Sequence, residues 1–223
     1  LGGMLYYFRN KEVSKKTAKI TAQKKMAEYE LYALRAQMNP HFVFNSLAAI
    51  QYYINNNDFE TSEKYLVKFS KLIRQFFELS KESEIPLETE IKLLKNYLDI
   101  EKLRFKEKLD YQIHIDSTLN LPETTIPSML LQPIVENAVN HGIFNKEKEG
   151  KINLYFRSID EQEFMVEIMD DGVGFSNSRK KPNGKVNSSA VLENRIAVLN
   201  RSKQWEIQFF NAYFLIEVLI NPP

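Results

Sequence analysis

The sequence lacks cysteine, and among its 223 residues it has only seven glycines and one tryptophan. The absence of cysteine excludes disulfides and thiolate metal sites, and it fits a reducing compartment. No Gly-Lys-Ser/Thr sequence is present, which excludes a Walker-type phosphate loop. The apolar stretch at residues 1–8 is too short to cross a bilayer, which takes about 20 residues. The remaining composition, 43% hydrophobic and 26% charged, is that of an ordinary globular protein.

The chain as a whole also lacks an excess of positive or negative charge, because its net charge is only +1. We therefore expect no nucleic-acid partner. Residues 1–25 are locally basic, with seven lysines and arginines against Glu12 alone. The chain begins with Leu1 and turns basic at Arg9, which favours a piece of a longer chain. Its start would then be the inner end of a spanning helix, with the lysines on the cytoplasmic side. The alternative is a frayed apolar N-terminus.

Residues 13–38 contain neither glycine nor proline, which favours a helix. Pro40 interrupts that run, because a proline inside a helix removes a hydrogen bond and clashes with the preceding turn. The pair Asn39–Pro40 is also typical of a helix cap followed by a first helical residue. We therefore expect a kink or a restart here, with His41 at the bend.

Beyond the bend, aliphatic residues at helical spacing predict a core-facing stripe of Val43, Leu47, Ile50 and Ile54. At about 100° per residue, His41 and Asn45 fall on the opposite side. A turn at 55–58 leads into a second amphipathic run over 66–79. Two such helices make an antiparallel hairpin, and its uncovered apolar faces predict that two copies pair in a four-helix bundle.

The pattern changes from helices to alternating strands after a junction at 82–86 and a helix that begins at Leu87. Strands are predicted over five ranges, the last two forming a hairpin: 109–115, 151–157, 164–170, 205–210 and 213–219. Helices are predicted over 127–141, bent at Pro133 and stopped by Gly142, and over 191–202. A mixed sheet with helices on one face is the simplest architecture.

Two segments of this second half suit a nucleotide. Asn137 can give magnesium a neutral oxygen while phosphates and water complete the octahedron, and it shares a helix face with His141. Asp170 ends a strand, where its carboxylate can accept a hydrogen bond from the exocyclic amine of adenine. Gly172 and Gly174 let the backbone approach a purine ring, which a Cβ would obstruct. The alternatives are a solvated asparagine and an ordinary Asp-Asp-Gly turn.

The segment 175–189 is rich in Ser, Asn, Gly and Lys. It is long for a structureless loop, and such loops are often lids. Its four cations are placed to face phosphates: Arg179, Lys180, Lys181 and Lys185.

Taken together, these motifs resemble those of the LytS-type sensor histidine kinases, a bacterial family. Its signature Asn-Pro-His-Phe-x-Phe-Asn matches residues 39–45. The resemblance continues through 97–105, 131–137 and 170–174, and so spans roughly residues 28–220. The motifs at 39–45 and 131–137, occurring one after the other in the same chain, are highly specific for this family.

The resemblance implies an α+β fold, in which an N-terminal helical hairpin forms a dimeric four-helix bundle. An α/β sandwich follows, a Bergerat-type mixed sheet with helices on one face. We expect a membrane-proximal stub at 1–12, dimerisation and histidine phosphotransfer helices at 13–82, and an ATP-binding catalytic domain at 83–223. The chain would be the cytoplasmic portion of an inner-membrane protein, preceded by a transmembrane or sensor segment.

By the same resemblance the chain uses ATP and Mg²⁺, with His41 as the phosphorylated residue and Asn137 as the magnesium ligand. Asn45, one turn from His41, would hydrogen-bond the phosphohistidine or the incoming partner. Further nucleotide contacts are expected at Glu136, His141, Asp170, Gly172, Gly174, Ser188 and Ser189. The implied partners are a second copy of the chain and the receiver domain of a response regulator, often of the LytTR type.

Two departures from the family pattern keep other functions open. Asn140 stands where relatives often have lysine. Relatives also have a second glycine-rich segment, which corresponds here to residues 187–192, and in this chain it has no glycine. A degenerate member would act as a phosphatase or scaffold with weak or no ATP turnover. A third possibility is that the chain is not a kinase and uses the same ATPase fold as a conformational clamp.

Overall fold

A computed structural model describes residues 40–144, 146, 148–160, 163–172, 188–201, 205–210 and 215–220. The chain divides into two compact units, 1–48 and 49–223, and each is described by itself. The predictions made for 1–39, for Gly174 and for the loop up to residue 187 lie outside the described residues.

The first two helices form where the sequence predicts them. Helix α2 (Pro40–Asn55) begins at the proline, whose missing N–H would have no helical partner at that position. Asp58 caps helix α3 (Phe59–Leu79), because its carboxylate accepts a hydrogen bond from Thr61 N at 3.1 Å. None of the helices in the described part is both long and apolar enough to span a bilayer.

The later helices are α4 (Leu87–Phe105), α5 (Gln132–Asn137) and α6 (Ser188–Arg201). A 3₁₀ turn, η1 (Lys106–Lys108), follows α4, and a π-helix, η2 (Ala138–Ile143), continues α5.

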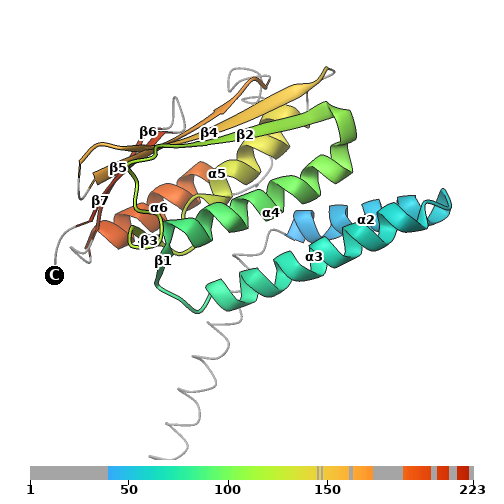
Figure 1. The fold of residues 1–223 in the computed structure, drawn as a ribbon, viewed down its shortest axis with the longest axis horizontal. Coiled ribbons are helices and arrows are strands. Elements are labelled where there is room, and N and C mark those ends of the chain that lie inside the picture. Colours follow the sequence, from blue (N-terminus) through green and yellow to red (C-terminus); the bar gives the residue numbers. More distant parts are fainter. Residues whose placement is uncertain are drawn as a thin grey trace, which may run out of the picture. The chain divides into compact units, whose positions relative to one another are not determined.

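The prediction of a helix from residue 127 is wrong at its start. The segment Thr125–Pro127 is strand β3, which pairs antiparallel with β1 (Glu84–Pro86) beside α4 (Figure 1). Pro133 therefore lies in the first turn of α5, where proline is tolerated, and does not bend a longer helix. Gly142 lies inside η2 and does not stop it.

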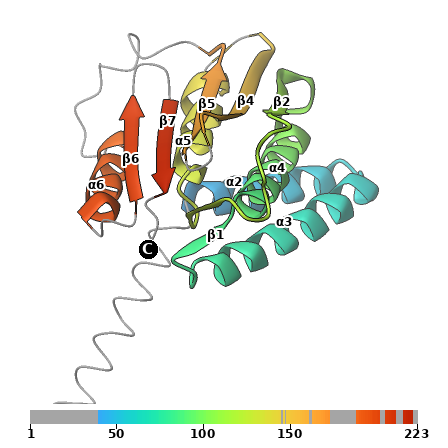
Figure 2. The ribbon, with the colours of Figure 1, turned by 60° about the vertical axis from the view of Figure 1, so that its left-hand side comes forward.

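The main sheet is mixed, as predicted. Its strands are β2 (Leu109–Ile115), β4 (Gly150–Ser158), β5 (Glu163–Asp170), β6 (Trp205–Phe210) and β7 (Leu215–Ile220). Figure 2 shows their order, β2-β4-β5-β7-β6, in which β2 and β4 are parallel and the other pairs are antiparallel. Helices α4, α5 and α6 lie along one face of this sheet (Figure 1).

The core lies between that face and the helices. Alternate strand residues point into it, because successive side chains on a strand face opposite sides. The buried strand residues are Leu109, Ile152, Leu154, Phe156, Phe164, Val166, Ile168, Trp205, Ile207, Ile216 and Val218. Helix α4 meets them with an apolar stripe in which Leu87, Ile91, Leu94 and Leu98 are buried.

The core stripe predicted for α2 is wrong. Ile50 is buried, but Leu47 and Ile54 are 50% and 47% exposed. Tyr53 takes the buried position instead: its ring lies 6.4 Å from that of Tyr65, and its hydroxyl donates a hydrogen bond of 2.7 Å to the Leu103 carbonyl. The prediction counted only aliphatic residues and therefore left out Tyr53. A tyrosine can also occupy a core position, because it buries a large ring while its hydroxyl stays hydrogen-bonded.

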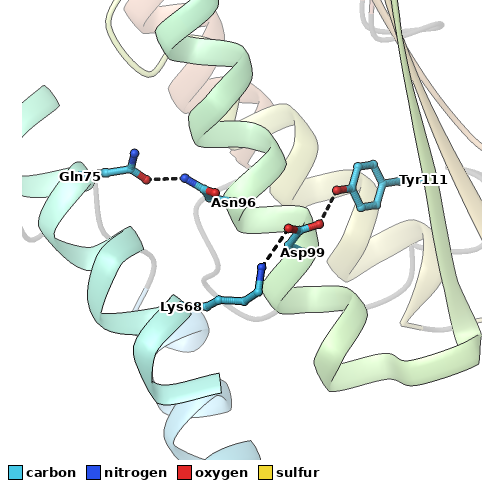
Figure 3. Close-up of polar contacts among 5 residues, drawn as sticks. All are labelled: Lys68, Gln75, Asn96, Asp99 and Tyr111. Atoms are coloured by element: carbon cyan, nitrogen blue, oxygen red, sulfur yellow. Dashed lines mark hydrogen bonds and ion pairs between the residues drawn. The ribbon is translucent and has the colours of Figure 1, made fainter. Parts of the chain in front are cut away.

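Helix α3 packs along α4 through a mixed surface. Leu72 and Phe76 are buried there, whereas Leu66 is exposed on another side. Polar pairs flank this apolar contact (Figure 3): Lys68 Nζ lies 3.0 Å from Asp99 Oδ2, and Asn96 donates a hydrogen bond of 2.7 Å to Gln75.

Asp99 joins this surface to the sheet, because it also accepts a 2.5 Å hydrogen bond from the Tyr111 hydroxyl (Figure 3). Burial alone would raise the pKa of Asp99, but the hydrogen bonds from Tyr111 and Lys68 outweigh it and hold the pKa below its usual value. The carboxylate therefore stays charged between the hairpin helix and the sheet.

Candidate functional site

The helix that carries the predicted magnesium ligand changes type at that residue. Asn137 is half-buried and is the last residue of α5, after which η2 hydrogen bonds join residues five apart, as in Phe144 N to Val139 O at 3.0 Å. The turn that starts at Asn137 therefore closes at Gly142. The prediction that Asn137 and His141 share a face assumed an α-helical period, which η2 does not have. Short π-helical turns are frequent at functional sites.

Gly142 is packed directly against the end of β5. A methyl group on Gly142 would lie 2.8 Å from the Asp170 Cγ, and one on Gly172 would lie 2.6 Å from Asp170 Oδ1 and 2.5 Å from the Gly142 carbonyl carbon. Gly172 N donates a hydrogen bond of 3.0 Å to Asp170 Oδ1. Both glycines are thus required by close approach, and together with Asp170 they form what we call the glycine cradle.

The two adjacent aspartates differ in their partners. Asp171 Oδ1 accepts a hydrogen bond of 2.7 Å from Lys151 N, and its Oδ2 lies 2.9 Å from Lys146 Nζ. Burial acts to raise the pKa of Asp171, but these two partners outweigh it and lower the pKa. Burial raises the pKa of Asp170 instead, against the opposing bond from Gly172. Asp171 therefore joins the ends of β4 and β5, and Asp170 is the carboxylate of the glycine cradle.

Glu136, which precedes Asn137, stands beside a buried charged cluster that the sequence reasoning missed. Gln132 donates a hydrogen bond of 3.1 Å to Glu136. Arg104 Nη2 lies 2.9 Å from the buried carboxylate of Glu101, an ion pair that lacks hydrogen-bond alignment. Burial raises the pKa of Glu101 to about 7; Arg104 opposes that rise and Glu136 adds to it. A signal was present, because residue 101 falls on the apolar stripe of α4, where a carboxylate is out of place.

The buried glutamates give a pH prediction. Glu90 on the same helix also has its pKa raised by burial to about 7, from an ordinary value of 4.5, against hydrogen bonds from Leu131 and Met129. The folded chain therefore keeps protons that the unfolded chain has released, and the free energy of unfolding should fall as pH rises from about 5 to 8. Each carboxyl accounts for at most about 1.4 kcal/mol per pH unit.

Urea denaturation at several pH values in that range measures this slope. Glu101→Gln, which removes one of the two titrating groups, should flatten it. An unchanged slope in Glu101→Gln would show that this carboxyl is already ionised in the folded chain.

The other predicted nucleotide contacts are described only in part. Ser188 and Ser189 are the first two residues of α6, but their side chains lie outside the described part, as does the side chain of His141. Helix α6 is fixed by Asn200, whose side chain donates to the Ile207 carbonyl and accepts from Ile207 N, both at 2.9 Å. Asn140 is half-buried within η2.

The predicted phosphoacceptor segment belongs to the other unit. His41 is the second residue of α2, and its side chain lies outside the described part. Asn45, which is half-buried, lies one turn further along the same helix. The structure thus gathers Asn137, Gly142 and the β5 end in one place and describes the phosphoacceptor helix separately.

These residues fit a purine nucleotide and magnesium. In the glycine cradle the space beside both glycines is filled by Asp170 and by backbone, so the two glycines fix the position of the Asp170 carboxylate, an acceptor that suits the amine of a purine. The side chain of Asn137 can supply the single neutral oxygen that magnesium accepts from a protein when phosphates and water complete its shell.

Comparison with known proteins shows the family of the chain. Residues 29–109 match the family described as Histidine kinase. The chain is 33% identical to "Sensor histidine kinase YpdA" of Escherichia coli (strain K12) over 77% of its own length and 29% of that protein. It is 31% identical to "Sensor protein LytS" of Oceanobacillus iheyensis over 89% of its length and 35% of that protein. The chain thus spans about a third of the curated relatives it matches.

Among solved structures, the histidine kinase domain from an Erythrobacter litoralis blue-light activated histidine kinase aligns over 86% of this chain and 93% of that chain. The identity is 14% and the TM-score is 0.45. The assignment rests on the sequence relatives. The chain belongs to the LytS-type sensor histidine kinases.

Proposed function

We propose that the chain is the kinase portion of a two-component sensor, which phosphorylates its own His41 from Mg-ATP. A neutral imidazole is nucleophilic, and the ordinary histidine pKa of about 6.5 leaves much of it neutral near pH 7. An imidazole nitrogen forms a bond to the γ-phosphorus, the bond from that phosphorus to the bridging oxygen breaks, and ADP leaves. Asn45, one turn away on α2, hydrogen-bonds the phosphohistidine or the incoming partner.

The observation that carries this proposal is the glycine cradle at the end of the helix that bears Asn137. Asp170 accepts a hydrogen bond from the adenine amine, and Gly142 and Gly172 pack against that carboxylate and hold it in place. Asn137 holds magnesium, which neutralises phosphate charge when bound. The remaining proposed nucleotide contacts are Glu136, His141, Gly174, Ser188 and Ser189.

Incubation with γ-labelled ATP and magnesium tests the proposal. The chain should acquire an acid-labile label, and His41→Gln should lose it completely. His114→Gln is the matched control, because His114 is an exposed histidine on β2, stacked on Tyr155 at 4.6 Å between ring centroids. ATP binding without label would favour the degenerate scaffold. Steady phosphate release by His41→Gln would favour the clamp.

The same proposal extends to partners and placement. Phosphohistidine passes its phosphoryl group to an aspartate on the receiver domain of a response regulator, of the LytTR type. The relatives are named as sensors, which supports a signalling role and a sensor or transmembrane segment upstream of residue 1. The chain would then be the cytoplasmic portion of an inner-membrane protein, with a membrane-proximal stub at 1–12.

The hairpin, within the proposed phosphotransfer domain 13–82, also dimerises. Helix α3 carries an exposed apolar stripe at Phe59, Leu66 and Phe77. Leu66 and Phe77 follow Phe59 by about two and five helical turns, so the three lie on one face. The stripe faces away from the buried Leu72 and suits a second copy of the hairpin in a four-helix bundle. Apolar side chains in such numbers on one helix face are typical of an interface.

We predict that Leu66→Glu converts the dimer to a monomer, because a charge would be buried at the centre of the stripe. Size-exclusion chromatography with light scattering over a range of concentrations measures the mass. Lys64→Glu is the control, since Lys64 is exposed on another side of α3 and should leave the mass unchanged. A wild-type chain that stays monomeric at every concentration would rule the dimer out.

A further inference from the structure

The turn Ser128–Leu131, which we call the junction turn, comes directly before α5. Leu131 is the cap residue of that helix, and its carbonyl accepts hydrogen bonds from Ile134 N at 3.0 Å and Val135 N at 3.2 Å. The conformation of the junction turn therefore fixes where the helix that bears Asn137 begins.

A buried carboxylate on α4 holds the junction turn. Glu90 has no exposed surface, and its two oxygens accept hydrogen bonds of 3.0 Å from Met129 N and Leu131 N. Met129 has a φ of 57°, in the left-handed region that residues other than glycine seldom adopt. Such a conformation persists only where its surroundings hold it.

A cation on α6 holds the same turn from another side. Arg195 Nη1 donates a hydrogen bond of 2.9 Å to the Met129 carbonyl, and its Nη2 donates to the Ser128 carbonyl. The guanidinium thus bridges two successive carbonyls, a geometry that its planar fork favours. Helix α6 begins at Ser188, so Arg195 ties the turn to the helix that carries the proposed phosphate contacts.

The junction turn is also bonded to the hairpin. The Ser128 hydroxyl donates a hydrogen bond of 2.7 Å to the carbonyl of Leu79, the last residue of α3. Ser128 N donates a hydrogen bond of 3.2 Å to Ser83 O in the segment that follows α3. The side chain of Ser128 is buried, so water does not compete for the hydroxyl bond.

We propose that the junction turn couples nucleotide binding to the C-terminal end of α3, with Glu90 and Arg195 as the positioning residues. The proposal rests on the nucleotide site proposed above. A nucleotide held by residues of α5 and α6 restrains both helices, and through them the junction turn. The Ser128 hydroxyl then transmits that restraint to Leu79, which lies on the helix proposed to carry the dimer stripe.

Hydrogen exchange of the whole 223-residue chain tests the coupling. Peptides that cover residues 76–83 are followed with and without Mg-ADP, while calorimetry measures the affinity. In the wild-type chain, nucleotide should slow exchange there about fivefold, the effect of one ordinary hydrogen bond on an equilibrium. Ser128→Ala should bind Mg-ADP within about twofold of wild type and lose this protection.

Ser80→Ala is the matched control, because the Ser80 hydroxyl also bonds a carbonyl of α3, that of Phe77 at 3.0 Å, but stays within the hairpin. It should keep the protection. Protection retained in Ser128→Ala, or a wild-type chain that binds Mg-ADP without protecting residues 76–83, would overturn the coupling alone. A wild-type chain that binds no nucleotide would overturn both the coupling and the proposed function.

The positioning role has its own measurement. Arg195→Met should weaken Mg-ADP binding about tenfold and also abolish the protection at 76–83, because the turn loses its link to α6. Arg201→Met, an exposed arginine on the same helix, should change neither. If Arg195→Met binds Mg-ADP with wild-type affinity and keeps the protection at 76–83, then Arg195 takes no part in the coupling.

Discussion

Gly142→Ala is expected to weaken Mg-ADP binding by about 100-fold while the chain still folds. The added methyl group would lie 2.8 Å from the Asp170 Cγ, so the carboxylate has to move. A displaced Asp170 loses a hydrogen bond to adenine, and a bond of that charged kind contributes about 2–3 kcal/mol. Calorimetric titration gives the affinity, and circular dichroism reports the fold.

Gly150→Ala is the matched control for this substitution. Its methyl group would lie 2.5 Å from the Ile143 Cδ1 and 3.3 Å from Asp171 Oδ1, so its nearest contact is an aliphatic side chain that can shift. We expect a small loss of stability with nearly normal affinity. Equal losses of affinity in Gly142→Ala and Gly150→Ala would mean that crowding alone, and not the position of the carboxylate, controls binding.

Leu72→Ala is expected to lower the free energy of unfolding by about 3 kcal/mol, the usual effect of a cavity at a fully buried leucine. Leu72 has no exposed surface, and its helix packs on α4. Since a domain of this kind is stable by only about 5–15 kcal/mol, the loss is a large fraction of the total. Val67→Ala on the same helix, at a side chain 62% exposed, should have almost no effect.

The single tryptophan lets this experiment follow the unfolding of one part of the chain. Trp205 is buried in β6, so its fluorescence reports unfolding of the sandwich and not of the hairpin. If α3 and the sandwich form one cooperative unit, Leu72→Ala shifts the fluorescence transition and the circular dichroism transition equally. A fluorescence midpoint that stays unchanged would show that α3 unfolds separately from the sheet.

The sheet was predictable because β4, β5 and β6 bury alternate residues. Such burial imposes a period of two on the sequence. The predicted ranges 109–115 and 205–210 are those of β2 and β6. The β6–β7 hairpin and the mixed sheet followed from the same pattern. Strand β3 does not follow from the sequence, because three residues are too few to show a period and its proline also fits a helix start.

The site was predictable in its residue types but not in its geometry. The short spacing from Asp170 to Gly172 indicates a close approach of backbone, yet nothing in it shows that Gly142 is the residue approached. That contact depends on η2, and the sequence pattern of a π-helix cannot be told from that of an α-helix. Glu90 was overlooked because its partners are backbone groups in a turn about forty residues away, beyond the reach of any local rule.

The parallel pairing of β2 with β4 has a consequence for synthesis on the ribosome. The two strands are separated by the whole segment 116–149, and pairings across such distances form late. The hairpins β4–β5 and β6–β7 join strands that are neighbours along the chain, so each can close soon after its second strand emerges. Helix α4 is translated before all of these strands, and its apolar stripe has to remain uncovered until they arrive.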